Sequence, residues 1–140
     1  MLGMMATNRN HALDGMRILA VEDQQDLREM LTVLLEQQGA TVIGCGSAVE
    51  AFAVLISDAL LDAAVFDISM PGEDGLALVG RLRRWESGNA PSHLPVIALT
   101  ALVSGDIQRE CRAAGFDHYL PKPVSPRILF NTLRRLAPLH

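Results

Sequence analysis

Five side chains that could take part in phosphoryl-transfer chemistry stand where short apolar segments of this chain end. Glu22 and Asp23 follow one such segment, Asp67 closes a second, Thr100 closes a third, and Lys122 follows a fourth. Carboxylates can hold a hard cation, one of them can attack phosphorus, and an amine can neutralise phosphate oxygens. The residue types therefore indicate chemistry on a phosphoryl group, provided that the fold brings them together.

Asp67 lies in the stretch "AAVFDISMPGEDG", residues 63–75, directly after four apolar residues. A carboxylate in such surroundings costs several kcal/mol unless a partner compensates its charge. Three neighbouring carboxylates also repel one another until a proton or a cation neutralises them. Mg²⁺ binds through oxygen ligands, commonly one or two carboxylates together with phosphate oxygens. We therefore expect Asp67 to be the nucleophile, with its charge offset by Mg²⁺ and Lys122.

Short apolar segments alternate with segments of helical periodicity, and this alternation predicts the elements that position the five side chains. Each predicted strand is followed by a helix, and the strands lie at 17–23, 40–45, 62–67, 94–100 and 116–121. The pattern is typical of an α/β fold whose parallel sheet has helices on both faces. Sites in such sheets form beyond the carboxyl ends of the strands, so the five side chains should converge on one edge.

Individual residues mark the ends of the predicted helices. Ser47 forms a capping box with Glu50, Ser104 precedes another helical segment, and Ser125 is followed by a proline that favours a first helical turn. Gly39 stands where the first helix would end in a left-handed residue. These signals predict where helices begin and end independently of the apolar pattern.

Apolar spacing predicts which helix faces are buried. In the second helix this spacing favours a buried face made of Val49, Phe52 and Ile56. A third helix is predicted at 75–85, and the polar segment 86–93 is expected to be an exposed loop.

The composition limits the classes of protein to which the chain can belong. Its 140 residues fit one domain, and the net charge of −4 gives no basic surface for nucleic acid. No apolar segment approaches the roughly 18 residues of a membrane span. Cys45 and Cys111 lack metal-ligand spacing and suit a reducing cytoplasm, which is the expected location. Residues 1–15 have no periodicity, so we expect a disordered N-terminal stub or linker before one domain at 16–140.

The motifs "VED", "FDISMPGEDG", "ALTA" and "YLPKP", in this order over residues 17–136, resemble the receiver domain of bacterial two-component response regulators. The resemblance implies a flavodoxin-like, doubly wound (βα)5 fold, in which five parallel strands have the order 2-1-3-4-5. It also implies a signalling domain that is not a classical enzyme, although such a domain assists its own phosphorylation and dephosphorylation. A cis peptide bond between Lys122 and Pro123 is implied as well.

The same resemblance assigns roles to the residues at the strand ends. Asp67 would be the phosphoacceptor, and Lys122 would pair with the bound phosphoryl group. Mg²⁺, for which Mn²⁺ could substitute, would be held by Asp23 and Asp67, by the backbone carbonyl of Ser69, and by Glu22 mostly through water. Glutamate at position 22 replaces the commoner aspartate and keeps its charge, so we expect metal binding to survive.

Two further residues would transmit the signal in such a domain. Thr100 would bond to the phosphoryl oxygen, and Tyr119 would turn inward as Thr100 moves. The face that partners read would comprise the fourth helix, the fifth strand and the fifth helix.

The expected partner is a histidine kinase or a histidine phosphotransfer protein that donates from phosphohistidine. The motifs further resemble those of receivers fused to hybrid histidine kinases, so the domain could be tethered to a kinase or free. No direct contact with nucleic acid or membrane is expected.

One alternative function is that of a haloacid-dehalogenase-like phosphohydrolase, but such enzymes carry an acid two residues after the nucleophile, where this chain has Ser69. A receiver-like interaction module without phosphorylation would lack Asp67, one of the paired acids or Lys122, all of which are present.

Overall fold

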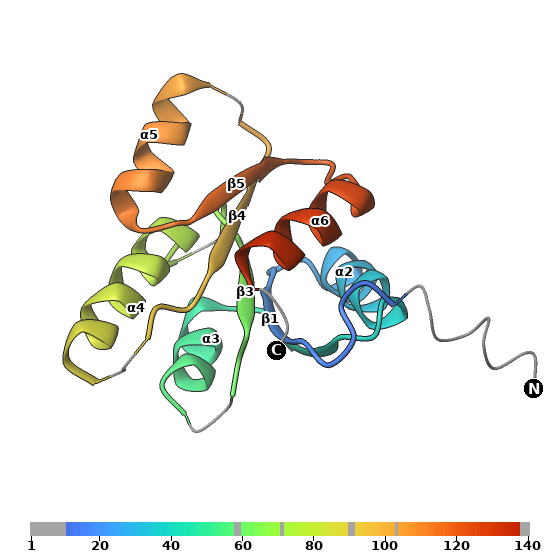
Figure 1. The fold of residues 1–140 in the computed structure, drawn as a ribbon. Helices are drawn as coiled ribbons and strands as arrows, with labels where there is room; N and C mark the ends of the chain where they lie inside the picture. The colour runs from blue at the N-terminus through green and yellow to red at the C-terminus, as the bar shows by residue number, and fades with distance from the viewer. Residues whose placement is uncertain (1–10, 58–59, 71, 90–91, 103, 138–140) are drawn as a thin grey trace, which may run out of the picture.

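A computed structural model describes residues 11–57, 60–70, 72–89, 92–102 and 104–137 of the chain. Within these residues five strands alternate with five helices (Figure 1). The strands are β1 (Arg17–Val21), β2 (Thr41–Cys45), β3 (Ala63–Asp67), β4 (Val96–Thr100) and β5 (His118–Pro121). The helices are α2 (Gln25–Gln37), α3 (Ala48–Leu55), α4 (Gly75–Asn89), α5 (Gly105–Ala114) and α6 (Pro126–Leu136).

The strands form one parallel sheet in the order β2-β1-β3-β4-β5, which confirms the predicted topology. Every residue of β3 and β4 is buried. Central strands of a parallel sheet are covered on both faces, which explains why these two segments are continuously apolar in the sequence.

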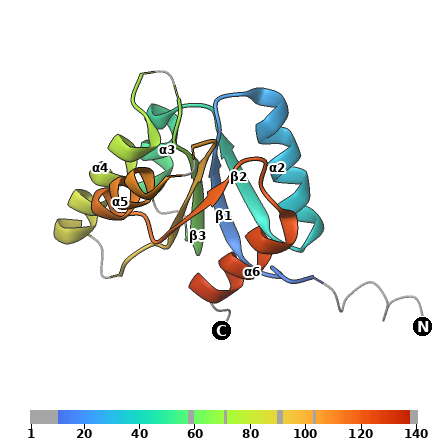
Figure 2. The ribbon, with the colours of Figure 1, turned by 90° about the horizontal axis from the view of Figure 1, so that it is seen from above.

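Helices cover both faces of the sheet, with α2 and α6 on one side and α3, α4 and α5 on the other (Figures 1 and 2). Successive strand residues point to opposite faces and so divide the core in two. Leu19 and Phe66 pack on the side of α3, α4 and α5, whereas Ile18 and Val65 pack on the side of α2 and α6. Among the residues that the structure describes, no helix has the length and apolar character to cross a bilayer.

The predicted serine caps are present. The hydroxyl oxygens of Ser47, Ser104 and Ser125 accept hydrogen bonds from the backbone N–H groups three residues later, at 3.2, 3.2 and 3.4 Å. Each cap satisfies a backbone donor that the first helical turn leaves unpaired. Pro126 then occupies the first turn of α6.

The buried face of α3 was predicted one residue out of phase. Val49 is 75% exposed and Ile56 is 41% exposed, while the sheet contacts the face made of Ala48, Ala51 and Leu55. One residue corresponds to a rotation of about 100° in an α-helix. Two alanines allow the helix axis to lie close to the sheet. This face is therefore buried, although Val49 and Ile56 are larger and more apolar.

The polar segment 86–93 is not a loop throughout, because α4 continues to Asn89. Glu86 stabilises this extension. One of its carboxylate oxygens accepts from Arg83 Nη1 at 2.8 Å, and the other accepts from the backbone N–H of Leu94 at 2.8 Å. The helix is thereby fixed to the segment that leads into β4.

The end of the expected N-terminal linker is part of the fold. Leu13 is fully buried in the core beside α2 and α6, and its N–H donates to the carbonyl of Gln38 at 2.8 Å. Gly39 has the predicted left-handed conformation, with φ of 95°, and a Cβ there would lie 2.1 Å from Asp14 Oδ1. The expected disorder therefore does not extend to this turn, whereas residues 1–10 lie outside the described residues. The segment before β1 is too short to show the periodicity that would have predicted the burial of Leu13.

Candidate functional site

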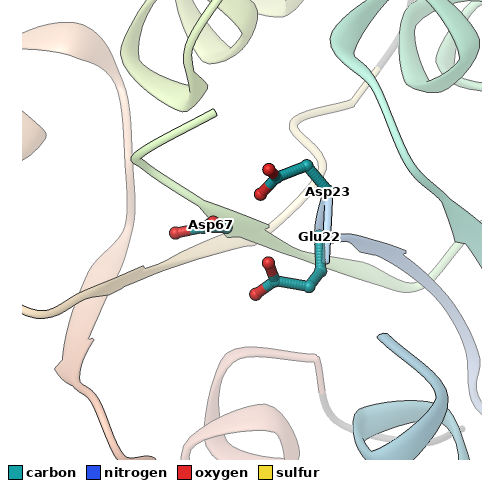
Figure 3. Close-up of side chains that lie close together, drawn as sticks. All are labelled: Glu22, Asp23 and Asp67. Carbon is teal, nitrogen blue, oxygen red and sulfur yellow. The ribbon is translucent and has the colours of Figure 1, made fainter. Parts of the chain in front are cut away.

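Three carboxyl groups meet at the carboxyl ends of the adjacent strands β1 and β3. Glu22 and Asp23 directly follow β1, and Asp67 is the last residue of β3. One carboxylate oxygen from each residue lies within 4.8 Å of the others. Figure 3 shows the three carboxyl groups directed into a common space. Only 3% of Glu22 and 3% of Asp67 is exposed, so two of the three acids are withdrawn from water.

Lys122, which follows β5, reaches across the strand ends into the same cluster. Its Nζ lies 3.0 Å from Asp67 Oδ1 and 3.2 Å from Glu22 Oε1, and donates to both. The peptide bond between Lys122 and Pro123 is cis, as predicted. The predicted convergence of strand-end residues thus holds for the acids and the amine.

The electrostatics of the cluster reflect an excess of carboxylates over amines. Burial raises the pKa of Glu22, and the charge of Asp67 raises it further, although a hydrogen bond from the N–H of Gln24 to Glu22 Oε2 (3.2 Å) opposes both effects. Burial alone would lower the pKa of Lys122. The hydrogen bond and charge of Asp67, together with those of Glu22, outweigh burial and raise it. Lys122 therefore remains a cation, and the cluster favours a second one.

The donor atoms fit a hard divalent cation. The acidic cluster offers carboxylate oxygens, which suit Mg²⁺ or Mn²⁺ better than metals that prefer nitrogen or sulfur. The backbone N–H of Ser69 donates to Asp67 Oδ1 at 3.2 Å, so the loop after β3 folds back over the end of the strand and keeps Ser69 beside the cluster. The group is an acidic cluster of the type that holds Mg²⁺.

Gly75, the first residue of α4, supports the main chain of Asp67. A Cβ at this position would lie 2.6 Å from the carbonyl oxygen of Asp67 and 3.0 Å from Ile68 Cα. The N–H of Gly75 also donates to the carbonyl of Ile68 at 3.0 Å. The helix consequently begins in contact with the strand end that carries Asp67. The sequence predicted Gly75 only as the first residue of a helix, because the close approach depends on tertiary packing.

Thr100 and Tyr119 lie on the same face of the sheet. Tyr119 pairs with Ala98, and Thr100 follows two residues later on β4, so all three side chains point to the side of α3, α4 and α5. The Thr100 hydroxyl accepts from the N–H of Leu102 at 3.0 Å and donates to its carbonyl at 3.3 Å. The described side-chain bonds of Asp67, in contrast, are with Lys122 and Ser69. The Tyr119 hydroxyl is bonded to the side-chain amide of Gln108.

Arg28 contacts the main chain of Glu22 and was not among the site residues predicted from the sequence. Its Nη1 donates to the backbone carbonyl of Glu22 at 2.9 Å from the first turn of α2. The contact fixes the main chain where β1 passes into α2. An arginine on an amphipathic helix normally faces solvent, so its residue type gave no signal for this contact.

An apolar groove of about 340 Å³ adjoins the cluster on the side of α2. Glu22 and Lys122 lie at its polar end, and Met30, which is 51% exposed, contributes to its rim. The remaining lining residues are apolar and come from α2, β4 and the segment after Lys122: Leu27, Leu31, Leu34, Leu99, Pro123 and Val124.

Comparison with known proteins places this geometry in a family. Residues 18–134 match the family described as response regulator receiver domain. An uncharacterized 14.6 kDa protein in the sodA1 3′ region of Leptolyngbya boryana is 38% identical over 123 residues, which cover 88% of this chain and 91% of that protein. Sensor protein GacS of Pseudomonas syringae pv. syringae is 34% identical over 113 residues, which cover 81% of this chain and 12% of GacS.

A solved structure has the same fold. The receiver domain of the histidine kinase CKI1 from Arabidopsis thaliana, complexed with Mg²⁺ and BeF₃⁻, matches with a TM-score of 0.80 and 26% identity, covering 91% of this chain and 93% of that chain. The family match spans both the strand ends that carry the acids and the strand that precedes Lys122. With its 2-1-3-4-5 sheet and its acidic pocket, this chain belongs to the response regulator receiver domain family, whose members are signalling modules.

Proposed function

We propose that this receiver domain accepts a phosphoryl group on Asp67 from a phosphohistidine of a histidine kinase or a histidine phosphotransfer protein. The observation that carries the proposal is the position of Asp67. Its carboxylate is buried at the end of a central strand, beside Glu22 and Asp23 and 3.0 Å from Lys122 Nζ. A carboxylate held rigidly beside a cation is suited to attack on phosphorus.

The transfer balances as a displacement at phosphorus. A carboxylate oxygen of Asp67 forms the new P–O bond, the P–N bond of the donor breaks, and the imidazole nitrogen leaves with the electron pair. The product on this chain is an acyl phosphate. Asp23, Asp67 and the backbone carbonyl of Ser69 would hold Mg²⁺, with Glu22 acting through water. When bound, Mg²⁺ neutralises charge on the phosphoryl oxygens.

Lys122 and Thr100 act on the phosphoryl group after transfer. The Lys122 ammonium, now bonded to Asp67 Oδ1, moves its hydrogen bond to a phosphoryl oxygen. The Thr100 hydroxyl leaves the backbone of Leu102 and donates to another phosphoryl oxygen. Tyr119 then moves inward along the face that it shares with Thr100. The surface that changes comprises α5, β5 and α6.

The family and the relatives support the proposed class of phosphoryl donor. CKI1 is a histidine kinase and GacS a sensor protein by name, and the matched part of GacS is 12% of its length, so this chain corresponds to one domain of such a protein. The apolar groove beside Lys122 offers a contact surface for the donor next to the acidic cluster. Free Cys45 and Cys111 agree with a cytoplasmic location.

The proposal is tested by intact-mass measurement after incubation with acetyl phosphate and Mg²⁺. One added phosphoryl group is expected on the wild type and none on Asp67→Asn, which keeps the shape of the side chain. Asp62→Asn, on a carboxylate before β3, is the matched control and should be labelled like the wild type. Full labelling of Asp67→Asn would refute the assignment. Steady release of phosphate over many turnovers from a phosphomonoester would instead favour a phosphohydrolase.

A further inference from the structure

The hydroxyl group of Tyr119 is held by a residue of the neighbouring helix. Gln108 of α5 donates a hydrogen bond from Nε2 to the Tyr119 hydroxyl on β5. Both residues line a hollow of about 250 Å³ formed by α5, β5 and the turn between them. Gln108 is exposed, whereas the half-buried Tyr119 packs partly against the core. The hydrogen bond thus fixes the polar end of a ring whose apolar part is already packed.

This hydrogen bond restrains Tyr119, one of the two residues proposed to transmit the signal. The other is Thr100, whose hydroxyl is bonded to the backbone of Leu102. Ala98, which is fully buried, lies two residues before Thr100 on β4 and pairs with Tyr119 on β5. An alanine leaves only a methyl group on the shared face. The Gln108 bond therefore supplies a polar restraint on the ring that its strand neighbour cannot supply.

We infer that Gln108 is a positioning residue that holds the Tyr119 ring in its present position beside α5 and thereby opposes the phosphorylated state. The inference rests on the proposed function, because it assigns a residue to the regulation of the same switch. An interaction made in only one of two conformations adds to the free-energy difference between them, and a ligand must overcome that difference to shift the population. Loss of the Gln108 bond consequently raises the apparent affinity for a phosphoryl analogue.

The expected gain in affinity is about 2- to 10-fold, which corresponds to the net contribution of one ordinary hydrogen bond. Gln108→Leu removes the donor and keeps a side chain of similar size. Tyr119 is the single tyrosine of the chain, so a ring-labelled tyrosine gives NMR signals from this residue alone. The probe is beryllofluoride, titrated in the presence of Mg²⁺. In Gln108→Leu without the probe, the ring signals should lie closer to those of the beryllofluoride-bound wild type.

Two further variants separate positioning of Tyr119 from a general effect on α5. Arg109→Ala alters the next residue of the same helix, whose side chain pairs with Asp106 and not with Tyr119. It should leave both the ring signals and the affinity at wild-type values. Tyr119→Phe removes the other half of the hydrogen bond. Adding Gln108→Leu to Tyr119→Phe should then give no further gain in affinity, whereas independent effects of the two residues would multiply.

The results distinguish this inference from the proposed function. Wild-type ring signals and wild-type affinity in Gln108→Leu would overturn the inference while leaving phosphorylation of Asp67 intact. A wild type that takes up neither beryllofluoride nor a phosphoryl group would overturn the proposed function. In that case, displaced ring signals in Gln108→Leu would still support a restraint of Tyr119 by Gln108, and unchanged ring signals would refute this restraint.

Discussion

Gly75 lies directly against the main chain of Asp67, so closely that a Cβ would stand 2.6 Å from the Asp67 carbonyl oxygen. The first turn of α4 and the end of β3 can meet in this way only if position 75 has no side chain. The contact belongs to backbone atoms, which cannot rotate away from a clash as a flexible side chain can. Glycine at this position therefore determines where the proposed phosphoacceptor, Asp67, lies.

Gly75→Ala should lower the free energy of unfolding by about 1–3 kcal/mol, because the added methyl group has to displace main-chain atoms. It should also slow labelling of Asp67 by acetyl phosphate. Gly80→Ala in the same helix is the matched control, since its Cβ would meet only Arg84 Nη1, at 3.5 Å. Alanine favours a helix interior over glycine, so this control should stabilise the protein by about 0.5–1 kcal/mol. Urea denaturation measures both; equal stabilities would contradict the contact.

Lys122→Met should lower the free energy of unfolding in the absence of Mg²⁺, because Glu22 and Asp67 then lose the cation to which both are bonded. We expect about 1–3 kcal/mol, less than for a fully buried pair, since 26% of the Lys122 side chain remains exposed. Added Mg²⁺ should restore part of the loss. Thermal unfolding with and without the metal measures this. A variant as stable as the wild type without Mg²⁺ would show that the two carboxylates need no compensation.

The stability of the metal-free protein should depend on pH through Glu22. The folded state raises the pKa of this carboxyl above its ordinary value of 4.5, so the folded state binds its proton more tightly than the unfolded state. This contribution to stability is complete below pH 4.5 and is lost as the pH rises through the higher folded value. Glu22→Gln should therefore be more stable than the wild type at neutral pH, with a gain that shrinks toward pH 4.5. A gain independent of pH would rule out titration of Glu22 as the cause.

Asp23 and Glu22 should differ in their contribution to Mg²⁺ affinity. Asp23→Asn removes a proposed direct ligand and should lower the affinity more than 100-fold, whereas Glu22→Gln removes a ligand acting through water and should lower it about 10- to 100-fold. Isothermal calorimetry with MgCl₂ measures both. The reverse order of the two losses would exchange the roles of the two acids.

The Thr100→Ala variant should still accept a phosphoryl group, but phosphorylation should change its conformation less than that of the wild type. The hydroxyl is proposed to be the group that phosphorylation attracts, so its loss reduces the differential stabilisation of the switched state. Amide exchange with and without beryllofluoride should change around Thr100 and along β5 in the wild type, and less in Thr100→Ala. Thr100→Ser keeps the hydroxyl and should behave like the wild type. Large, equal changes in all three proteins would exclude Thr100 from the route.

The sequence was sufficient for the sheet and for the acidic cluster because both depend on patterns along the chain. Short apolar segments predict the strands, and parallel strands bring their carboxyl ends to one edge, which places Glu22, Asp23 and Asp67 together. The strand order was implied by the resemblance to receiver domains. Serine caps are equally local, since each bonds to the backbone three residues later.

The features that were missed depend on contacts between elements. The buried face of α3 is set by how closely Ala48 and Ala51 approach the sheet, and small side chains carry little weight in an apolar pattern. Leu13 is buried because it packs beside α2 and α6, although the short segment in which it stands has no apolar periodicity. Gln108 and Tyr119 meet only because α5 lies next to β5. None of these relationships leaves a periodic signal in the chain.

The backbones of Thr100 and Lys122 are joined by one hydrogen bond, from the N–H of Lys122 to the carbonyl of Thr100 at 2.8 Å. The two residues proposed to contact the phosphoryl group thus have backbone anchors of fixed separation. Their side chains can rotate, but the anchors can part only if β4 and β5 separate. Pairing of β4 with β5 therefore links the two proposed phosphoryl contacts, and a change that weakens this pairing should disturb both of them at once.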